Sequence, residues 1–339
     1  MYDIIALIEA IKKIKGPKLF LLNLFIGKIK EQPTAKFEVH TKSNGQVIAP
    51  IVGRRSAGTL VQGTGYEVTM YQPSMIKPYT IAEADKILKQ QFGQNLYSNP
   101  QTNAAKQVAE ELNYLKEVQS RTEQWMLTQL LITGILPQEE GKKGIQFTTN
   151  FRKEVLSGNN KWDHADADII SYLREQQDII QEETGEIVDS LVVSPDVIKP
   201  LTNNPKIIDV QKRYNSSLIQ VDPKKIGEGA KFIMHIPELD LNVYSFQDIY
   251  TTVENPEKTM KLLPKGTAIL GKAGSFQKHY GAFPFKKDSL SADDAELFIG
   301  QAAIRKNAVI GSEDNQVELH SAPFIMPRDA RGWLFAKVI

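Results

Sequence analysis

A glycine-rich stretch near the start of the chain holds the residues best suited to bind a phosphate group. It reads "IVGRRSAGTLVQGTG", and its glycines and arginines are Gly53, Arg54, Arg55, Gly58, Gly63 and Gly65. Gly53 and Gly58 have the spacing of a nucleotide-binding loop, in which backbone N–H groups and a cation hold the phosphates. The residue types by themselves therefore allow a nucleotide site.

The residues around these glycines argue against a nucleotide site. A phosphate loop continues with Lys and then Ser or Thr, whereas Gly58 is followed by Thr59 and Leu60. The loop must also open a helix. The residues that follow, "YEVTMYQPSMIKPYTI", are rich in β-branched and aromatic side chains and contain two prolines, which predicts a strand. The nucleotide interpretation therefore fails on two independent counts.

A second cluster combines three carboxylates with an imidazole. Asp163, His164, Asp166 and Asp168 lie within six residues, and both groups are suitable metal ligands. No second spaced His or Glu motif accompanies them. Aspartates at the entrance of a helix also cap its free amides and interact favourably with its dipole. We therefore predict helix capping here, and no metal.

The other candidate catalytic residues are scattered. The chain has no cysteine, which excludes disulfides, thiolate zinc sites and cysteine nucleophiles. The remaining histidines are His40, His235, His279 and His320. None accompanies a G-x-S-x-G or H-E-x-x-H motif, so each is expected to be structural or exposed. The sequence thus predicts no catalytic residue and no cofactor, and an enzyme with an unrecognised site stays as an alternative.

Composition and the N-terminus indicate a globular chain with an arm. The 339 residues carry 41 Lys and Arg against 40 Asp and Glu, so no overall charge favours nucleic acid or anionic lipid. Five isoleucines fall on one face of a predicted N-terminal helix: Ile4, Ile5, Ile8, Ile11 and Ile14. Lysines interrupt the apolar runs before they reach the length that spans a bilayer. We expect an arm that docks on its own or a neighbouring protein, and no membrane partner; the alternative for this segment is a helix that lies on a membrane surface.

The sequence pattern over residues 36–78 predicts a long antiparallel ribbon that contains the glycine-rich stretch. The segment "AKFEVHTKSNGQVIAPIV" alternates apolar and polar residues and includes Asn44-Gly45, a strong hairpin-turn signal. A two-stranded ribbon of this length has little core of its own and is marginally stable alone. It is therefore expected to lie on a partner.

The rest of the chain mixes helices and strands. Thr80-x-x-Glu83 resembles a capping box, and Gly93 would end the helix that follows. Apolar residues at three- to five-residue steps predict one long helix over Thr102–Leu131, with Gly134 at its C-terminal cap. A second hairpin, a helix–strand–helix unit around "LVVSP" and a β-rich region after Lys224 complete the prediction.

The order of these elements resembles one known family, the lambda-type major capsid proteins of tailed bacteriophages. The resemblance covers the chain from about residue 20 to its end. It rests on the motifs "APIVG", "YQPSMIKPYTI", "LLITG", "WDHADADII", "LVVSP", "LLPKGTAILG…HYG" and "HSAPFIMPRDARGWLFAKVI". Their order and spacing carry the likeness, since each motif is weak by itself.

The resemblance implies an α+β capsid fold with a long spine helix. The implied parts are an N-terminal arm at 1–35, an extended β-hairpin loop at 36–80, a peripheral domain at 81–185, a central axial α/β domain at 186–308 and strands at 309–339 that return to the peripheral domain. In such a protein the six glycines and arginines at 53–65 would belong to an intersubunit arm. The glycines would permit the bends that the arm needs while the shell changes shape.

The resemblance also implies function and partners. The protein would self-assemble through pentamers and hexamers into the icosahedral head of a virion or prophage, in the cytoplasm of the bacterial host. Portal and scaffold proteins, and a decoration protein, would be its partners, and packaged DNA would be contacted only non-specifically. The alternative of the same architecture is a bacterial protein-cage shell similar to an encapsulin.

The failed phosphate loop gives a first prediction. The purified protein is expected neither to hydrolyse ATP nor to bind it tightly, because residues 53–65 lack the lysine and the helix N-terminus that hold phosphates. Calorimetric titration with ATP and a phosphate-release assay measure both properties. Micromolar affinity that Gly58→Val abolishes would show that the stretch is a nucleotide site.

Overall fold

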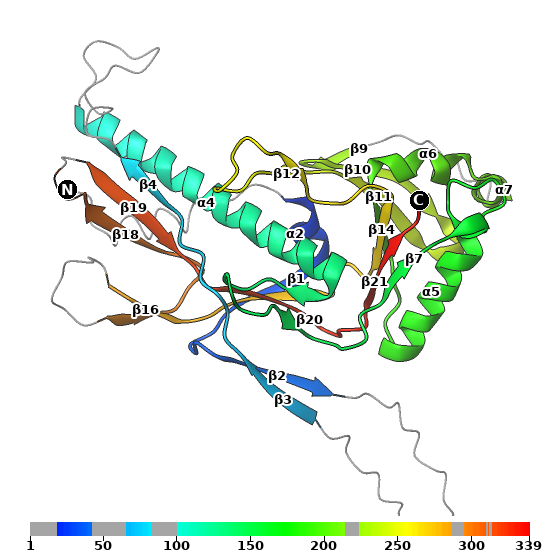
Figure 1. Cartoon of the computed structure of the whole chain (residues 1–339), viewed down its shortest axis with the longest axis horizontal. Helices are drawn as coiled ribbons and strands as arrows, with labels where there is room; N and C mark the ends of the chain where they lie inside the picture. The colour runs from blue at the N-terminus through cyan, green and yellow to red at the C-terminus, as the bar shows by residue number, and fades with distance from the viewer. Residues whose placement is uncertain are drawn as a thin grey trace, which may run out of the picture.

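The computed structural model describes most of the chain. The described residues are 19–42, 66–82, 100–213, 224–286, 295–309, 311 and 314–339. Figure 1 shows a long helix that crosses the molecule, with a large sheet and its helices at one end and a smaller sheet at the other. Helices and strands are both present in separate layers, which is an α+β arrangement.

The long helix is α4 (Pro100–Thr133), with 34 residues and a length of about 51 Å. It contains the whole predicted helix and confirms it, with two more residues at each end. Gly134 follows at φ +73°, and its N–H donates to the carbonyl of Leu130 at 2.8 Å. This left-handed residue ends the helix as predicted, and a Cβ there would lie 2.5 Å from the ring of Phe151.

The largest sheet has seven strands, in the order β7-β21-β14-β8-β11-β10-β9. Its strands are β7 (Lys153–Val155), β8 (Ser190–Val193), β9 (Lys224–Gly227), β10 (Ala230–Ile236), β11 (Leu241–Phe246), β14 (Thr267–Gly271) and β21 (Trp333–Lys337). Every residue of β8 and β14 is buried. A sheet that is buried on both faces needs apolar layers on each side.

Helices cover both faces of this sheet. Leu191 and Val193 pack in one cluster with α5 (Ile169–Thr184), α6 (Pro195–Asn203) and α7 (Pro205–Arg213). Val192, between them in the chain, packs in a second cluster with α2 (Phe20–Phe25) and the C-terminal part of α4. Successive side chains of a strand point to opposite faces, so β8 contributes to both layers.

Six smaller sheets complete the described part of the chain. Two have three strands, in the orders β1-β15-β20 and β18-β19-β4. Their strands are β1 (Ile26–Glu31), β15 (Phe276–Tyr280), β20 (Pro323–Pro327), β18 (Ala303–Ala308), β19 (Asn315–His320) and β4 (Tyr79–Ala82). Four pairs have two strands: β2 (Phe37–Lys42) with β3 (Tyr66–Tyr71), β5 (Ile135–Leu136) with β6 (Ile145–Gln146), β12 (Ile249–Tyr250) with β13 (Met260–Lys261), and β16 (Phe283–Phe285) with β17 (Glu296–Phe298). Two 3-10 turns, η1 (Gly158–Asn160) and η3 (Pro237–Leu239), complete the elements.

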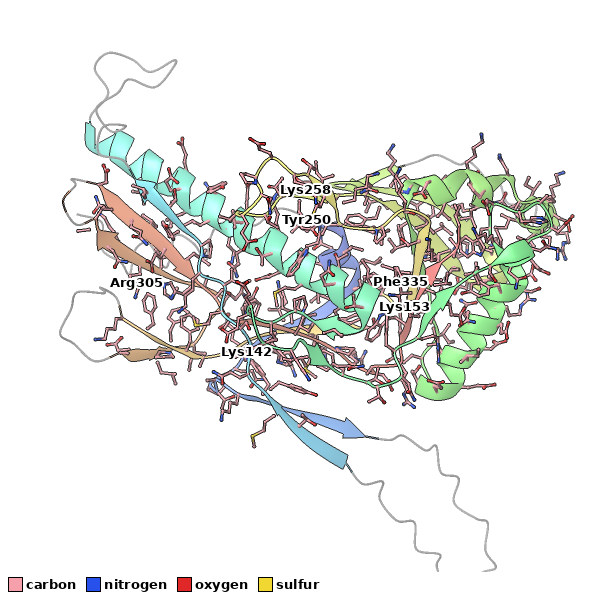
Figure 2. All side chains as sticks on the ribbon, in the orientation of Figure 1. Lys142, Lys153, Tyr250, Lys258, Arg305 and Phe335 are labelled. Carbon is pink, nitrogen blue, oxygen red and sulfur yellow. The ribbon has the colours of Figure 1, made fainter. Side chains whose placement is uncertain are left out.

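Several sequence predictions are confirmed. The second hairpin is β5–β6, and the helix–strand–helix unit is α5, β8 and α6. The predicted strand after the glycine-rich stretch is β3, and the region after Lys224 forms strands. Figure 2 shows Lys153 and Phe335 together where β7 joins the sheet, with the Lys153 ammonium 5.7 Å from the ring centre.

One local prediction needs correction. Thr80 is not the cap of a helix: it lies in β4, and its hydroxyl donates to Glu111 of α4 at 2.8 Å. The extended sheet pairing and this tertiary bond replace the local capping box; Glu83 and Gly93 lie outside the described residues. Asn44-Gly45, the predicted hairpin turn, also lies outside them; among the described residues β2 pairs with β3.

The packing of α4 gives a second prediction. Leu112 is 1% exposed. It packs in a small apolar cluster with residues of β18 and β19, on the side of α4 that faces these strands. Leu112→Asp is expected to lower the free energy of unfolding by on the order of 4 kcal/mol, because it buries an unpaired charge. Denaturant unfolding measures this. Asn113→Asp, on the exposed face of the same turn, is the control and should change stability by about 0.5 kcal/mol or less. Equal effects of the two variants would contradict the packing.

Candidate assembly surfaces

The β2–β3 ribbon projects from the body of the molecule, as Figure 1 shows. Its base is held by aromatic stacking. The buried ring of Phe37 stacks on Phe324 of β20 with ring centres 4.9 Å apart, and Tyr71, directly opposite Phe37 in the ribbon, lies 6.1 Å from the same ring. Farther out, Met70 is 63% exposed. The ribbon is therefore anchored at one end, and next to this base it exposes the apolar side chain of Met70.

The predicted arm residues extend this ribbon in sequence. Gly53, Arg54, Arg55, Gly58, Gly63 and Gly65 all lie outside the described residues. The strands on either side of them are paired in register to the last described residues, Lys42 opposite Tyr66. The antiparallel ribbon is thus confirmed over 37–42 and 66–71, and the role of the six residues stays a prediction.

A second exposed surface lies on the three-stranded sheet β18-β19-β4, along the N-terminal half of α4. Strand β4 is an edge of this sheet. Thr80 faces α4, whereas its neighbours Tyr79 and Ile81 are 61% and 44% exposed. Edge strands with apolar side chains are ready to pair with another chain. This edge is a candidate contact surface.

Glu318 organises the polar face of the same sheet. One of its carboxylate oxygens accepts from Arg305 Nε at 3.0 Å and from His320 Nε2 at 2.9 Å, and the other accepts from Gln316 at 2.6 Å. Burial would raise the pKa of Glu318, but the bonds from His320 and Arg305 outweigh burial and lower it. The ion pair therefore links β18 to β19, and Figure 2 marks Arg305 on this sheet.

A buried polar cluster joins α4 to β15. Glu123 is 2% exposed; its Oε2 accepts from Lys278 Nζ at 2.7 Å, and its Oε1 accepts from Tyr280 Oη at 2.9 Å and Gln119 Nε2 at 2.8 Å. Burial first, and the carboxylate second, raise the pKa of Tyr280 well above its ordinary value, so the phenol stays protonated and donates. Gln119 also donates to Ser321 Oγ at 2.9 Å. Three chain segments are thus held by one carboxylate and one amide.

Sequence reasoning missed this cluster. Lys278 and Tyr280 lie more than 150 residues from Glu123 and carry no motif. One signal was available: Gln119 and Glu123 continue the helical face of Leu112 and Leu115, where the pattern calls for apolar residues. Polar residues on a predicted buried face need buried partners.

In the aspartate-rich stretch, one residue has the predicted capping role. Asp168 is the N-cap of α5 and accepts from the Ser171 N–H at 3.1 Å. Burial would raise the pKa of Asp168, but bonds from Lys206 and Ser171 outweigh it and lower the pKa. Asp163 and Asp166 are exposed. Within the described part of the chain, no group of three or more His, Cys, Asp or Glu side chains could hold a metal ion.

The histidines are not gathered into one site. His279 lies in β15 and His320 in β19; both are buried, and burial is the main cause that lowers the pKa of each. His235 lies in β10, where its Nδ1 is 3.1 Å from Asn242 Oδ1. His40 lies in β2.

No helix among the described residues is long and apolar enough to cross a membrane.

The helix, sheets and projecting ribbon together define a shell-forming capsid fold, and comparison with known proteins agrees. The chain belongs to the family described as phage major capsid protein E, whose model matches residues 3–338. It is a structural protein of that family.

Solved structures show the same fold at low sequence identity. A protein assigned as a prophage capsid protein from Escherichia coli CFT073 is 15% identical, with a TM-score of 0.69 over 100% of this chain and 99% of the other. A phage-related protein from Bordetella bronchiseptica RB50 is 12% identical, with a TM-score of 0.57 over 98% and 95%. No curated protein sequence matches the chain.

The Glu123 cluster gives a third prediction. Glu123→Gln leaves the Lys278 ammonium buried without its counter-charge and is expected to cost about 3–5 kcal/mol of unfolding free energy. The double variant Glu123→Gln/Lys278→Met removes both charges and should recover part of that loss. Chemical denaturation of the four proteins of this cycle measures the coupling, expected at roughly 1–3 kcal/mol.

An exposed ion pair provides the control for this cycle. Asp209 and Arg213 pair at 3.2 Å on α7 with both side chains more than half exposed. Asp209→Asn should cost about 0.5 kcal/mol or less, because exposed i,i+4 pairs contribute little. A Glu123→Gln variant as stable as Asp209→Asn would show that the buried cluster does not hold α4 to β15.

Proposed function

We propose that copies of this chain assemble, as pentamers and hexamers, into the icosahedral head shell that encloses phage DNA. The observation that carries the proposal is the match of a phage major capsid family to residues 3–338. The projecting ribbon supports it, because a two-stranded ribbon away from the body has little core to bury its apolar side chains in. A closed shell supplies neighbouring copies at every such surface.

The arm at residues 53–65 is proposed to contact a neighbouring subunit. The paired ends of β2 and β3 support this, since Lys42 and Tyr66, the last described residues on either side, lie at the end of the ribbon that points away from the body. Each contact can be weak, because every copy in a shell repeats it and the contacts act together. The glycines would allow the positive φ values and bends that a contacting arm needs.

The division into parts is also a proposal: arm 1–35, hairpin loop 36–80, peripheral domain 81–185, axial domain 186–308 and return strands 309–339. Packing of β4 and β19 beside the N-terminal half of α4 supports the peripheral part. The seven-stranded sheet, with five of its strands within 186–308, supports the axial part, and α5 and β21 also pack with it.

The proposed partners follow from shell assembly in the host cytoplasm. They are other copies of this chain, portal and scaffold proteins, and a decoration protein. The near balance of 41 basic and 40 acidic residues supports only non-specific contact with packaged DNA, because a strongly basic wall would bind the genome tightly. We further propose that the protein is not an enzyme, in keeping with a family of structural proteins.

Deletion of Gly53–Gly65 tests the arm and gives a fourth prediction. The unassembled subunit should melt at an unchanged temperature, since the aromatic base of the ribbon and residues 43–52 remain. Particle yield by sedimentation should fall sharply, because each copy loses a repeated contact. A variant with the same residues in shuffled order controls for length and composition.

Two results would overturn this proposal. A deletion that unfolds the subunit would place residues 53–65 in the core. Particles of unchanged yield and stability would show that the segment is a dispensable loop.

A further inference from the structure

A cleft beside the buried Glu123 cluster carries an unbalanced charge. It lies between α2 and β1 on one side and α4 and β15 on the other, with a volume of about 330 Å³. Its apolar lining is Leu19, Leu22, Ile26 and Ile29, and its charged lining is Lys116, Glu123 and Lys278. Ile29 is 52% exposed, so the cleft opens to the surface.

The hydrogen bonds at Glu123 leave Lys116 without an ion pair among the described residues. Both carboxylate oxygens already accept from Lys278, Tyr280 and Gln119. Lys116 Nζ donates at 3.1 Å to the neutral Oε1 of Gln119, and it forms no ion pair with any described residue. The cleft therefore holds two ammonium groups and one carboxylate.

Partial burial raises the free energy of the charged Lys116 ammonium. Lys116 is half-buried, and burial is the main cause that lowers its pKa; Lys278 adds to that shift, and Glu123 opposes it. A partly desolvated cation is stabilised by a counter-charge at close range. A single added carboxylate would balance the three charges, whereas a phosphate dianion would leave an excess of negative charge.

We propose that this cleft binds the carboxylate of an Asp or Glu side chain from a second copy of this chain. The aliphatic side chains around Lys116 suit the carbon stem of such a residue, and the ammonium suits its carboxylate. The inference rests on the proposed function, because a shell of identical copies places the same partner at every cleft in a fixed ratio.

Zero-length coupling in assembled particles tests the contact. Particles are grown from an equal mixture of unlabelled and ¹⁵N-labelled protein and treated with a water-soluble carbodiimide. The reagent takes up water while an amide forms between Lys116 Nζ and a carboxyl group within hydrogen-bond distance. Mass spectrometry should find a peptide that joins Lys116 of one isotope to an Asp or Glu of the other, and this link should be absent from the unassembled protein.

Two variants sharpen the test. Lys116→Met should remove the link and lower particle yield, while its subunit still melts as a folded protein because Met keeps the aliphatic stem. Lys231→Met, at an exposed lysine of β10, is the matched control and should keep both the link and the yield.

Other outcomes would overturn the inference. Coupling of Lys116 only to Glu123 of its own chain, or no mixed-isotope link in particles that do form, removes the second copy from the cleft. Protection of Lys116 from acylation by added acetate, without a mixed link, would assign the cleft to a free carboxylate instead. Absence of particles by electron microscopy would refute the proposed function itself and the inference with it.

Discussion

The arrangement of this protein depends on one long helix that is buried against two different cores. Near its N-terminal end, Leu112 and Leu115 of α4 pack with Ile304 and Leu319 in the β18-β19-β4 sheet. Near its C-terminal end, Leu127, Leu130 and Leu131 pack against the seven-stranded sheet, and Trp333 of β21 donates to the carbonyl of Leu131 at 3.2 Å. Because a helix of 34 residues is stiff, these two contacts fix the positions of both sheets.

Between the two cores, α4 contacts β15 through the buried carboxylate of Glu123. A carboxylate as deeply buried as Glu123 is tolerated only when its bonds are complete, and here Lys278, Tyr280 and Gln119 complete them. Hydrogen bonds are directional, whereas apolar contacts are not, so this cluster allows only one arrangement of its partners. The cluster therefore fixes the position of β15 along α4. Strand β1, which follows α2, pairs with β15 beside this cluster.

Surfaces that are unsatisfied in one copy are the natural contact surfaces of a shell protein. The ribbon is anchored by stacked aromatic rings at its base and exposes Met70 next to it. The β4 edge exposes Tyr79 and Ile81. In the cleft, the Lys116 ammonium forms no ion pair with a described residue. These three features differ in chemistry, so in the proposed shell backbone pairing, apolar burial and charge balance would each contribute to recognition between copies.

The sequence by itself determined the elements whose signals are local. The apolar repeat over Thr102–Leu131 and the glycine after it specified α4, because helix periodicity and a left-handed cap act within a few residues. Asp168 at the start of α5 and the apolar run of β8 were predictable for the same reason. The order of such motifs was enough to indicate the capsid family.

Only the tertiary structure decided which distant segments meet. Thr80 has a local pattern typical of a cap, yet sheet pairing with β19 and the bond to Glu111 place it in a strand. The partners of Glu123 come from more than 150 residues away, and β21 inserts between β7 and β14 although it ends the chain. These choices follow from burying apolar faces and completing buried polar bonds across the whole fold, which no short window of sequence contains.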